Sequence, residues 1–294
     1  MMQKIVELSV MDWQFSADPM QQKSALDALE NGSVLLLPQL PFRLSPQEKA
    51  LLTSVEGSAK NISWDPARGV RGNDGATRRD PAALQAMLGR YAASTQSLLQ
   101  ALLPAYRGAL RQGKTSFRPV EISGRKTSWR KDDTRLHVDS FPSSPNQGKR
   151  ILRVFTNINP DGVARVWKLG APFEEVARRF LPKVAKPLFG SAALMQLLKI
   201  TKSRRSPYDH YMLHLHDGMK ADLAYQAHQH ECDPTLYRFL PGQTWIVYTD
   251  LVSHAALSGQ HALEQTFMLP VEAMGQQLRS PLAVLERQLG ARLA

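Results

Sequence analysis

Apolar side chains in the first third of the chain recur every three to four residues, as they do along one face of a helix. Asp18-Pro19 and Asp80-Pro81 each place an N-cap residue before a proline at the first helical position. The predicted helices cover residues 20–29, 46 to about 55, and 81 to about 103. A short apolar run at 34–37 predicts a buried strand, and the stretch 65–80, rich in glycine and arginine, predicts a loop. Residues 1–112 are therefore expected to be mostly helical.

After Gly113 the apolar period changes from 3.6 to 2, the period of a strand. The alternation is clearest from 135 to 141. Further elements are expected as strands at 151–158 and 244–249, an interrupted helical insertion at 172–211, and a C-terminal helix after Pro270. Strands bracketed by helices predict an α+β fold with an antiparallel β core. We expect one domain over 1–294, with this core at 113–270 and the C-terminal helix at 271–294.

Composition narrows the class of protein. The chain has 294 residues, of which 43% are apolar, enough to bury a core without covalent cross-links. Cys232 is its one cysteine, so an intrachain disulfide, a cysteine-rich zinc site and an iron–sulfur cluster are excluded. No apolar run approaches the roughly 20 residues of a membrane span. The sequence therefore predicts a cytoplasmic protein.

Positive charge is concentrated in one part of the chain. The formal net charge is +11, and residues 111–153 contain eleven Lys/Arg against four Asp/Glu, or 11 − 4 = +7. Such a run is often only a solvated face. If it binds a partner, that partner is anionic: nucleic acid, a phospholipid surface or an acidic metabolite. Charge alone does not choose among them.

The clearest chemistry lies in the pair His137 and Asp139. Residues two apart point to the same side of a strand, whereas on a helix they diverge by about 200°. The best-placed third ligand is His254, which follows the apolar strand 244–249 after a short turn. Two imidazoles and one carboxylate on one face hold ferrous iron and leave coordination positions open. The alternative is a surface strand with an incidental His-x-Asp sequence.

Two other histidine pairs, 214/216 and 228/230, have the same spacing. Neither has an acidic residue at a further two-residue step, so each is a weaker set of ligands. We expect His216, Asp217 and Lys220 to line a pocket instead.

Longer strings around the His-x-Asp sequence resemble those of the Kdo hydroxylase family. The main ones are SWRKDDTRLHVDSFP at 128–142 and RILRVFTNINP at 150–160. The resemblance continues through 216–222 and 241–267, so it spans about 115–270. Members of that family are iron(II)- and 2-oxoglutarate-dependent dioxygenases that hydroxylate C3 of 3-deoxy-D-manno-oct-2-ulosonic acid (Kdo) in the inner core of bacterial lipopolysaccharide.

The resemblance implies a double-stranded β-helix (jelly-roll, cupin-like) core and iron ligation by His137, Asp139 and His254. It implies iron(II), 2-oxoglutarate and O2 as cofactor and co-substrates. The expected partner is a Kdo-containing lipid A precursor and not nucleic acid. The expected location is cytoplasmic, peripheral on the inner face of the bacterial inner membrane.

The sequence departs from the superfamily at the 2-oxoglutarate anchor. Many of these oxygenases carry an arginine about ten residues after the distal histidine, where this chain has Glu264 and Gln265. Other branches place a basic residue on the strand after His-x-Asp. Arg153 is therefore our first candidate and Arg150 the second, because a planar guanidinium suits a carboxylate. The alternative is that Arg153 pairs with an acid on a neighbouring strand.

A sugar acid on a phosphorylated lipid calls for a basic rim around the iron. The nearest basic residues in sequence are Arg118, Arg125, Lys126, Arg130 and Arg135. Together with His216 and Lys220, we predict Lys126, Arg130 and Arg135 as substrate-binding residues. Three tryptophans, at 129, 167 and 245, either line the pocket or pack in the core.

Two other functions fit part of the pattern. A basic nucleic-acid-binding protein would account for the charge, although the sequence has no helix-turn-helix, zinc-finger or RNP-like string. A dioxygenase with another anionic substrate would keep the same iron ligands.

Residues 187–200 form a mostly apolar run of 14 residues, too short to span a bilayer. Basic residues flank the run at Lys183, Lys186, Lys202, Arg204 and Arg205. The pattern fits either a segment that docks on an anionic membrane or an ordinary buried helix with a basic end. The C-terminal leucine stripe, with Arg279, Arg287 and Arg292, is a weaker candidate for the same role.

Overall fold

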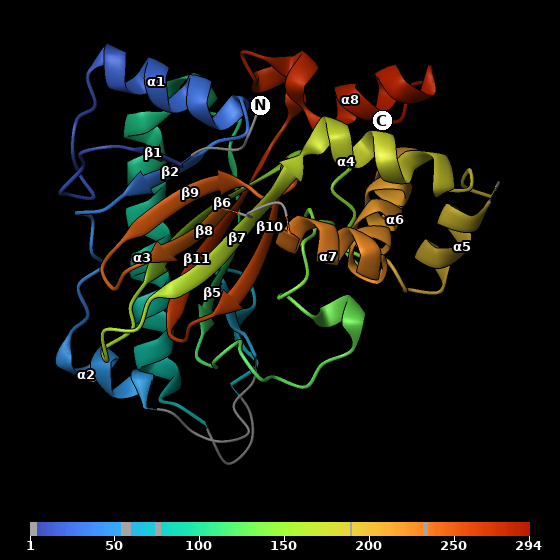
Figure 1. The fold of residues 1–294 in the computed structure, drawn as a ribbon. Helices are drawn as coiled ribbons and strands as arrows, with labels where there is room; N and C mark the ends of the chain where they lie inside the picture. The colour runs from blue at the N-terminus through green and yellow to red at the C-terminus, as the bar shows by residue number, and fades with distance from the viewer. Residues whose placement is uncertain (1–4, 54–59, 74–77, 189, 232–234) are drawn as a thin grey trace.

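The computed structural model describes residues 5–53, 60–73, 78–188, 190–231 and 235–294. Two sheets form its centre, and helices flank them (Figure 1). The larger sheet has the order β1 (Ile5–Glu7), β2 (Val34–Leu37), β9 (Thr244–Tyr248), β6 (Arg150–Asn157), β11 (Ala262–Leu269), β5 (Arg111–Arg118), β3 (Ile62–Asp65) and β4 (Gly69–Arg71). The smaller sheet has the order β10 (Val252–Ser258), β7 (Arg165–Pro172) and β8 (Thr235–Phe239).

The chain passes several times between the two sheets as the core strands follow one another. β5, β6, β9 and β11 belong to the larger sheet, while β7, β8 and β10 belong to the smaller one. The backbone of His137 pairs with that of His254 on β10, which adds an extended segment to the free edge of the smaller sheet. All pairings among these strands are antiparallel. This is the double-stranded β-helix, or jelly roll, that the resemblance implied.

The strand expected at 135–141 is reduced to that single bridge. On the side away from His254, the side chain of Gln226, on α7 (Leu223–Glu231), makes the hydrogen bonds that a neighbouring strand would otherwise make. Its Nε2 donates to the carbonyl of Leu136 at 3.0 Å, and its Oε1 accepts from the Leu136 N–H at 2.9 Å. The segment is extended as predicted but is held by a side chain instead of a ladder.

The helices predicted near the N-terminus are confirmed as α1 (Pro19–Glu30), α2 (Pro46–Lys49) and α3 (Pro81–Leu102). Asp18, Ser45 and Asp80 cap them through their side chains. The stretch expected as a loop begins instead with a hairpin, β3–β4, whose Trp64 and Val70 pack against the α3 side of the core. The first 112 residues therefore also supply strands to the larger sheet.

Four helices cover one end of the jelly roll: α4 (Phe173–Phe180), α5 (Ser191–Leu197), α6 (Pro207–Ala221) and α7. The helical insertion is confirmed, and it runs further than predicted because Ser206-Pro207 begins α6. The C-terminal helix α8 covers only Pro281–Leu289. Leu278 lies before it in a 3-10 turn and is 77% exposed, so the predicted leucine stripe is not continuous. Among the described helices, none is long and apolar enough to cross a membrane.

Candidate active site

His137, Asp139 and His254 meet between the two sheets. One ligand atom from each lies within 4.8 Å of the others, although His137 and His254 are more than a hundred residues apart. Two backbone hydrogen bonds align the histidines: the His137 N–H donates to the His254 carbonyl at 3.0 Å, and the His254 N–H donates to the His137 carbonyl at 2.9 Å. The Asp139 N–H donates to the Thr249 carbonyl at 2.7 Å. The ligand set predicted from sequence is therefore assembled by backbone pairing.

Each histidine is oriented by a backbone carbonyl. Nδ1 of His137 lies 2.7 Å from the Arg135 carbonyl, and Nδ1 of His254 lies 2.8 Å from the Val252 carbonyl. A carbonyl accepts only from a protonated nitrogen, so Nδ1 carries the hydrogen and Nε2 keeps its lone pair. Both lone pairs are thereby available to a metal ion, which is the usual arrangement around ligating histidines.

The charge state of the three residues suits a divalent cation. Burial lowers the pKa of His137 and of His254, so both imidazoles are neutral at neutral pH. Burial alone would raise the pKa of the Asp139 carboxyl, but the positive charge of Arg153 lowers it below its usual value. Two neutral nitrogens and one carboxylate are a donor set that fits iron(II). The imidazole of His254 also stacks on the indole of Trp167, with ring centroids 4.9 Å apart.

A cavity of about 280 Å³ opens beside these ligands. Its lining combines apolar rings with charged groups: Lys60, Asn61, Arg118, Asp133, Arg153, Phe155, Arg165, Trp167 and Ala256, besides the three ligands. The volume and the charged lining suit a small anionic molecule.

Arg153 lies at the centre of a buried chain of charges. Its Nη2 is 3.2 Å from Oδ2 of Asp139, and its Nη1 is 3.0 Å from Oε1 of Glu264 on β11. Nε of Arg118 donates to Oε2 of the same glutamate at 2.7 Å. Burial would raise the pKa of Glu264, but the two guanidinium groups lower it, so the glutamate is ionised. Arg153 is thus both in the cavity and paired with an acid on a neighbouring strand.

Arg150, the second candidate for the 2-oxoglutarate anchor, lies outside the cavity. It lies three positions before Arg153, and an odd step on a strand reverses the face. Its guanidinium is fully buried, with Nε donating to Asp250 at 2.7 Å and the group lying 3.9 Å from the centre of the Tyr248 ring.

The sequence prediction missed Arg165 and did not assign a role to Trp167, both on β7. Arg165 Nη1 donates to the Gly259 carbonyl at 3.2 Å, while Arg165 Nε and Trp167 Nε1 have no acceptor among the described residues. Burial lowers the pKa of Arg165 to about 10, so it remains protonated at neutral pH. Unpaired buried donors facing a cavity are costly without a ligand. An arginine in a buried strand was the available sequence signal.

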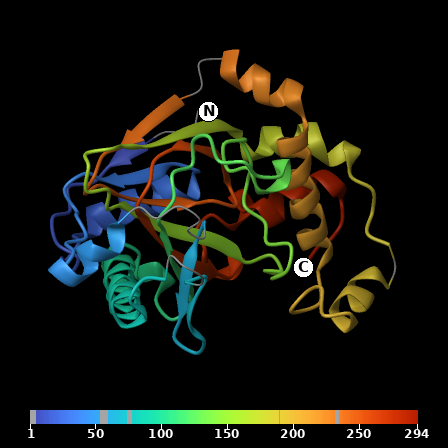
Figure 2. The same cartoon turned by 90° about the horizontal axis from the view of Figure 1, so that it is seen from below.

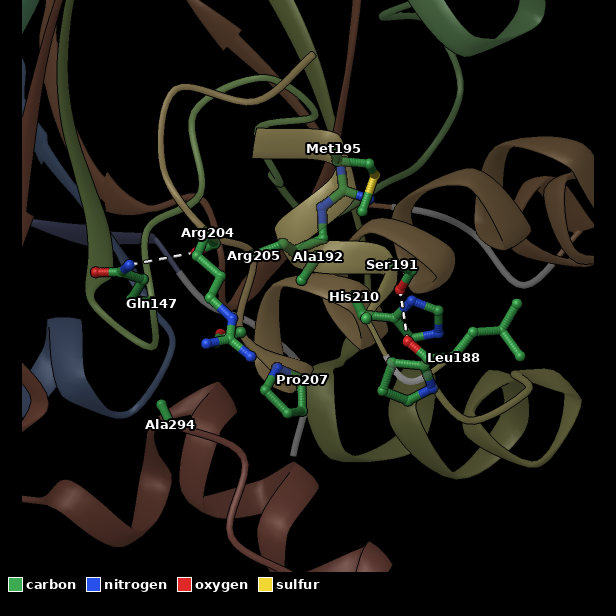
Figure 3. A pocket seen from close by; sticks show the side chains of 13 residues that line it. Gln147, Leu188, Ser191, Ala192, Met195, Arg204, Arg205, Pro207, His210 and Ala294 are labelled. Carbon is green, nitrogen blue, oxygen red and sulfur yellow. Dashed lines mark hydrogen bonds between the residues drawn. The ribbon is translucent and has the colours of Figure 1, made fainter. Parts of the chain in front are cut away.

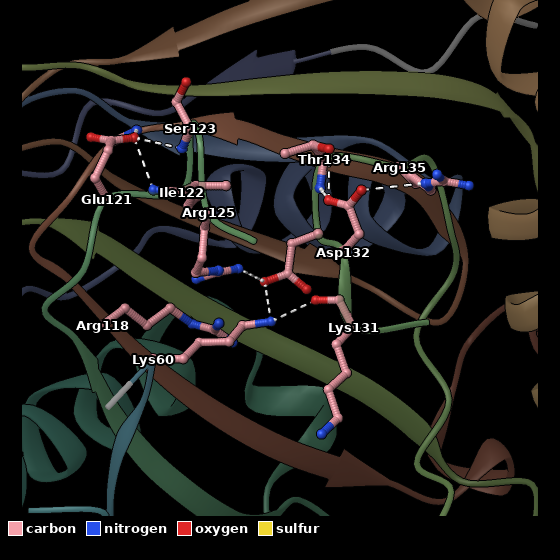
Figure 4. Close-up of polar contacts among 12 residues, drawn as sticks. Lys60, Arg118, Glu121, Ile122, Ser123, Arg125, Lys131, Asp132, Thr134 and Arg135 are labelled. Carbon is pink, nitrogen blue, oxygen red and sulfur yellow. Dashed lines mark hydrogen bonds and ion pairs between the residues drawn. The ribbon is translucent and has the colours of Figure 1, made fainter. Parts of the chain in front are cut away.

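Two further lining residues, Lys60 and Asp133, were not singled out from the sequence; Figure 4 shows the polar contacts around Lys60. Lys60 and Arg125 both point to Asp133, with N to Oδ2 distances of 2.6 Å and 3.1 Å. Lys60 also donates to the Lys131 carbonyl at 3.1 Å. Burial would raise the pKa of Asp133, but Arg118 and Lys60 lower it well below its usual range. No motif marked Lys60, because its position depends on pairing between β3 and β5.

The five predicted substrate-binding residues lie around the cavity and not in its lining. Arg135 donates to the Lys220 carbonyl at 2.7 Å, and the buried Lys220 ammonium donates to the Arg130 carbonyl at 3.1 Å. Arg130 is exposed, stacks over Trp129 at 4.1 Å and pairs with Asp217 at 3.1 Å. Lys126 is exposed.

His216 sits against the iron ligands but on a helix. It lies on α6, with Nδ1 2.8 Å from the Val138 carbonyl and its ring 5.0 Å from that of His137. Because a helix begins at Ser206-Pro207, residues two apart do not share a face here. His214 therefore points away from His216 and contacts the His210 carbonyl. The pair 228/230 lies on α7, and its side chains are outside the described residues.

A second, outer pocket of about 480 Å³ lies next to this site. Its lining includes Trp129, Arg130, Lys183, His214 and Asp217. The segment from Trp129 to Asp133 contributes to both pockets, so one stretch of chain separates them. Of the three tryptophans, Trp129 lines the outer pocket and Trp167 the inner cavity, while Trp245 is fully buried in the core.

A jelly roll that presents two histidines and one aspartate, with room for a small anion beside them, defines the class of non-heme iron(II)- and 2-oxoglutarate-dependent dioxygenases. The family model of 3-deoxy-D-manno-oct-2-ulosonic acid (Kdo) hydroxylase matches residues 12–292. The chain belongs to the Kdo hydroxylase family, and it is an iron(II)- and 2-oxoglutarate-dependent enzyme that takes a Kdo-containing substrate.

Solved structures of the Kdo hydroxylase KdoO are similar over nearly the whole chain. The complex with α-ketoglutarate and Fe(III) is 46% identical with a TM-score of 0.93, covering 99% of this chain and 98% of that chain. The cobalt(II) complex is 47% identical with a TM-score of 0.92, covering 98% and 97%. The complex with succinate and Fe(III) is 46% identical with a TM-score of 0.91, with the same coverage. The comparison with curated protein sequences found no match.

Proposed function

We propose that this Kdo hydroxylase acts on C3 of a Kdo sugar attached to a lipid A precursor. The observation that carries the proposal is the cavity beside His137, Asp139 and His254, whose lining holds several cationic side chains. The test is mass spectrometry of Kdo-lipid A after incubation with iron(II), 2-oxoglutarate and O2. A gain of one oxygen, located at C3 by fragmentation, is expected. An unchanged mass, with turnover on another anionic substrate, would refute it.

Iron bound by His137, Asp139 and His254 supplies, with 2-oxoglutarate and O2, the oxidation of an unactivated C–H bond. The protein residues bind and orient the two organic molecules. We propose Arg153 as the group that binds the distal carboxylate of 2-oxoglutarate, because it lines the cavity directly beside Asp139. The charge of Glu264 keeps this guanidinium in place from the other side.

Arg165 and Trp167 are proposed to bind the carboxylate of the sugar. Both side chains line the same cavity from β7, and each has one buried donor, Nε and Nε1, without a partner among the described residues. A carboxylate between them would satisfy both donors and offset the cost of their burial. The carboxylates of 2-oxoglutarate and of the sugar are thus assigned to different guanidinium groups, those of Arg153 and Arg165.

The outer pocket is proposed to hold the lipid A side of the substrate. Arg130 is exposed there, Lys183 shares its lining, and Lys126 lies three residues before Trp129. Arg135, His216 and Lys220 already have partners inside the protein. We propose that these three residues keep the segment between the two pockets, Trp129 to Asp133, in place. They would contact the substrate only where it passes along this segment.

Replacing Arg153 and Arg165 separately should affect different substrates. Arg153→Ala is expected to raise the KM for 2-oxoglutarate about ten- to a hundredfold, the cost of losing a hydrogen bond to a charged group. Arg165→Ala is expected to raise the KM for the sugar by a similar factor and leave that for 2-oxoglutarate within about twofold. Steady-state kinetics with each substrate varied in turn measures both values.

Arg153→Lys is the matched variant, because it keeps the charge and loses the bidentate geometry. An iron titration of all three variants separates weak 2-oxoglutarate binding from weak iron binding. If Arg153→Ala leaves the dependence on 2-oxoglutarate unchanged, the anchor lies elsewhere in the cavity.

A lipid-linked sugar also places the enzyme at a membrane. We propose a cytoplasmic enzyme that works peripherally on the inner face of the inner membrane. An accompanying preference for anionic lipid is in keeping with the net charge of +11.

A further inference from the structure

One surface of the protein is apolar although nothing in the described structure covers it. It consists of the segment 187–200 around α5, without residue 189, and we refer to it as the α5 surface. Five large apolar side chains on it are between 55% and 80% exposed: Leu188, Leu194, Leu197, Leu198 and Ile200. No residue of α5 is buried. The buried-helix interpretation of this run is therefore wrong, since an ordinary core helix would turn these leucines inward.

The α5 surface has a margin of positive charge. Residues 183–205 contain no Asp or Glu, and their basic side chains are Lys183, Lys186, Lys199, Lys202, Arg204 and Arg205. Partial burial, and then the positive charges of Lys114, Arg68 and Arg71, lower the pKa of Lys202. The positive surface thus continues from the insertion onto β5 and the β3–β4 hairpin. Two copies of such a surface would repel each other, which argues against self-association.

A cavity of about 480 Å³ lies beneath this surface, between α5 and the start of α6 (Figure 3). Its walls are mostly apolar and include Pro187, Leu188, Ala192 and Met195, whereas Arg204 and Arg205 line it from one side. Apolar walls beside two guanidinium groups match the boundary between an acyl chain and a phosphate headgroup.

We propose that the α5 surface docks on a bilayer of anionic phospholipid, with its leucines in the acyl boundary and its basic residues on the headgroups. This combination of exposed leucines and surrounding basic residues is typical of interfacial segments. The proposal rests on the proposed function only in that a lipid-linked sugar requires access to a membrane. Binding to vesicles is measurable without iron, 2-oxoglutarate or turnover.

The α5 surface is directly connected to the loop that follows the iron ligand Asp139. The Lys202 N–H donates to the Ser143 carbonyl at 2.9 Å, and Arg205 donates to the Pro142 carbonyl at 2.7 Å. Lys183, at the other end of the basic margin, lines the outer pocket. In both views α5 lies at the edge of the molecule, away from the two sheets (Figure 1 and Figure 2). Docking by this edge brings the outer pocket next to the membrane.

Sedimentation with vesicles tests the proposal. The parent protein should bind vesicles of phosphatidylglycerol and phosphatidylethanolamine, bind phosphatidylcholine vesicles weakly, and lose binding as salt rises. Leu197→Asp should weaken binding about tenfold or more, the order expected from withdrawing one leucine side chain from an apolar phase. Lys202→Gln with Arg204→Gln should weaken it about 25-fold, since each basic residue near an anionic surface contributes about fivefold.

Matched controls carry the same chemical changes on other faces. Leu236→Asp changes a leucine on β8 that is 56% exposed, and Lys49→Gln with Arg107→Gln removes two exposed charges. Both controls should sediment like the parent. Circular dichroism verifies that each variant is folded, and the side chains at Leu197, Lys202 and Arg204 are exposed, so unfolding is not expected.

Three outcomes would overturn the proposal. The first is that Leu197→Asp sediments like the parent, and the second is that the controls lose as much binding as the α5 variants. The third is that the parent ignores vesicles and forms a dimer that Leu197→Asp dissociates, which would assign the surface to a second copy of the chain. Hydroxylation of Kdo-lipid A is measured alongside by mass spectrometry. Its absence in the parent refutes the proposed function and leaves the vesicle result standing.

Discussion

Replacement of His137, Asp139 or His254 by alanine is expected to remove iron binding and lower turnover by about a thousandfold or more, because the three ligands act as a unit. Any one loss leaves only two protein ligands, so double variants should be hardly worse than single ones. Titration with iron(II) in the absence of O2 measures binding, and oxygen consumption with 2-oxoglutarate measures turnover.

His216→Ala is the matched control for iron content. Its ring lies 5.0 Å from that of His137, but the residue is on helix α6 and its Nδ1 is hydrogen-bonded to the Val138 carbonyl. This variant should keep a full equivalent of iron. The ligand assignment is wrong if His254→Ala keeps its iron while His216→Ala loses it.

Arg150→Ala should destabilise the protein by about 3–5 kcal/mol, the cost of leaving a buried charge without its partner. Asp250 and Arg150 are both fully buried, and their 2.7 Å ion pair is closed off by Tyr248 and Met274. Urea denaturation of the metal-free protein measures the free energy of unfolding. The double variant Arg150→Met with Asp250→Leu should recover most of the loss, because an apolar pair needs no desolvation of charge.

Lys23→Ala provides the comparison with an exposed ion pair. Lys23 and Asp27 are 2.7 Å apart at the surface of α1, and such pairs contribute less than about 1 kcal/mol. If Arg150→Ala were as stable as the parent but needed far more 2-oxoglutarate, Arg150 would bind the co-substrate after all.

The shared face of His137 and Asp139 was predictable from sequence because its signal is local. The spacing of His137 and Asp139 places both side chains on one side of any extended chain, whatever the sheet around it. The proline-marked helix starts are equally local, and Asp18 and Asp80 cap helices where predicted. Only the distance between His137 and His254 needed the complete fold.

The rest of the cavity lining was not predictable, because it depends on pairing between distant strands. Arg165 is carried into the cavity by β7, which pairs with β10 and β8, and Lys60 is carried there by the pairing of β3 with β5. Neither residue stands in a motif. Arg153 had two open interpretations because its partner, Glu264, is more than a hundred residues away and is brought within reach by the pairing of β11 with β6.

The segment 187–200 shows a different limit. Its apolar content suits both a core and a membrane surface, since both remove leucine from water. Only the neighbours of α5 decide between them, and the described structure provides none for Leu197.

The hydrogen bonds from Gln226 to Leu136 mean that the insertion between β7 and β8 cannot be shortened freely. Gln226 lies 90 residues after Leu136 in the chain, yet it binds both the backbone N–H and the backbone carbonyl of this residue, which precedes His137. A trimmed enzyme with a short turn in place of 173–231 would retain all three iron ligands and lose the support that aligns one of them. Attempts to reduce this protein to a minimal jelly roll should therefore keep α7, even where the α5 surface is removed.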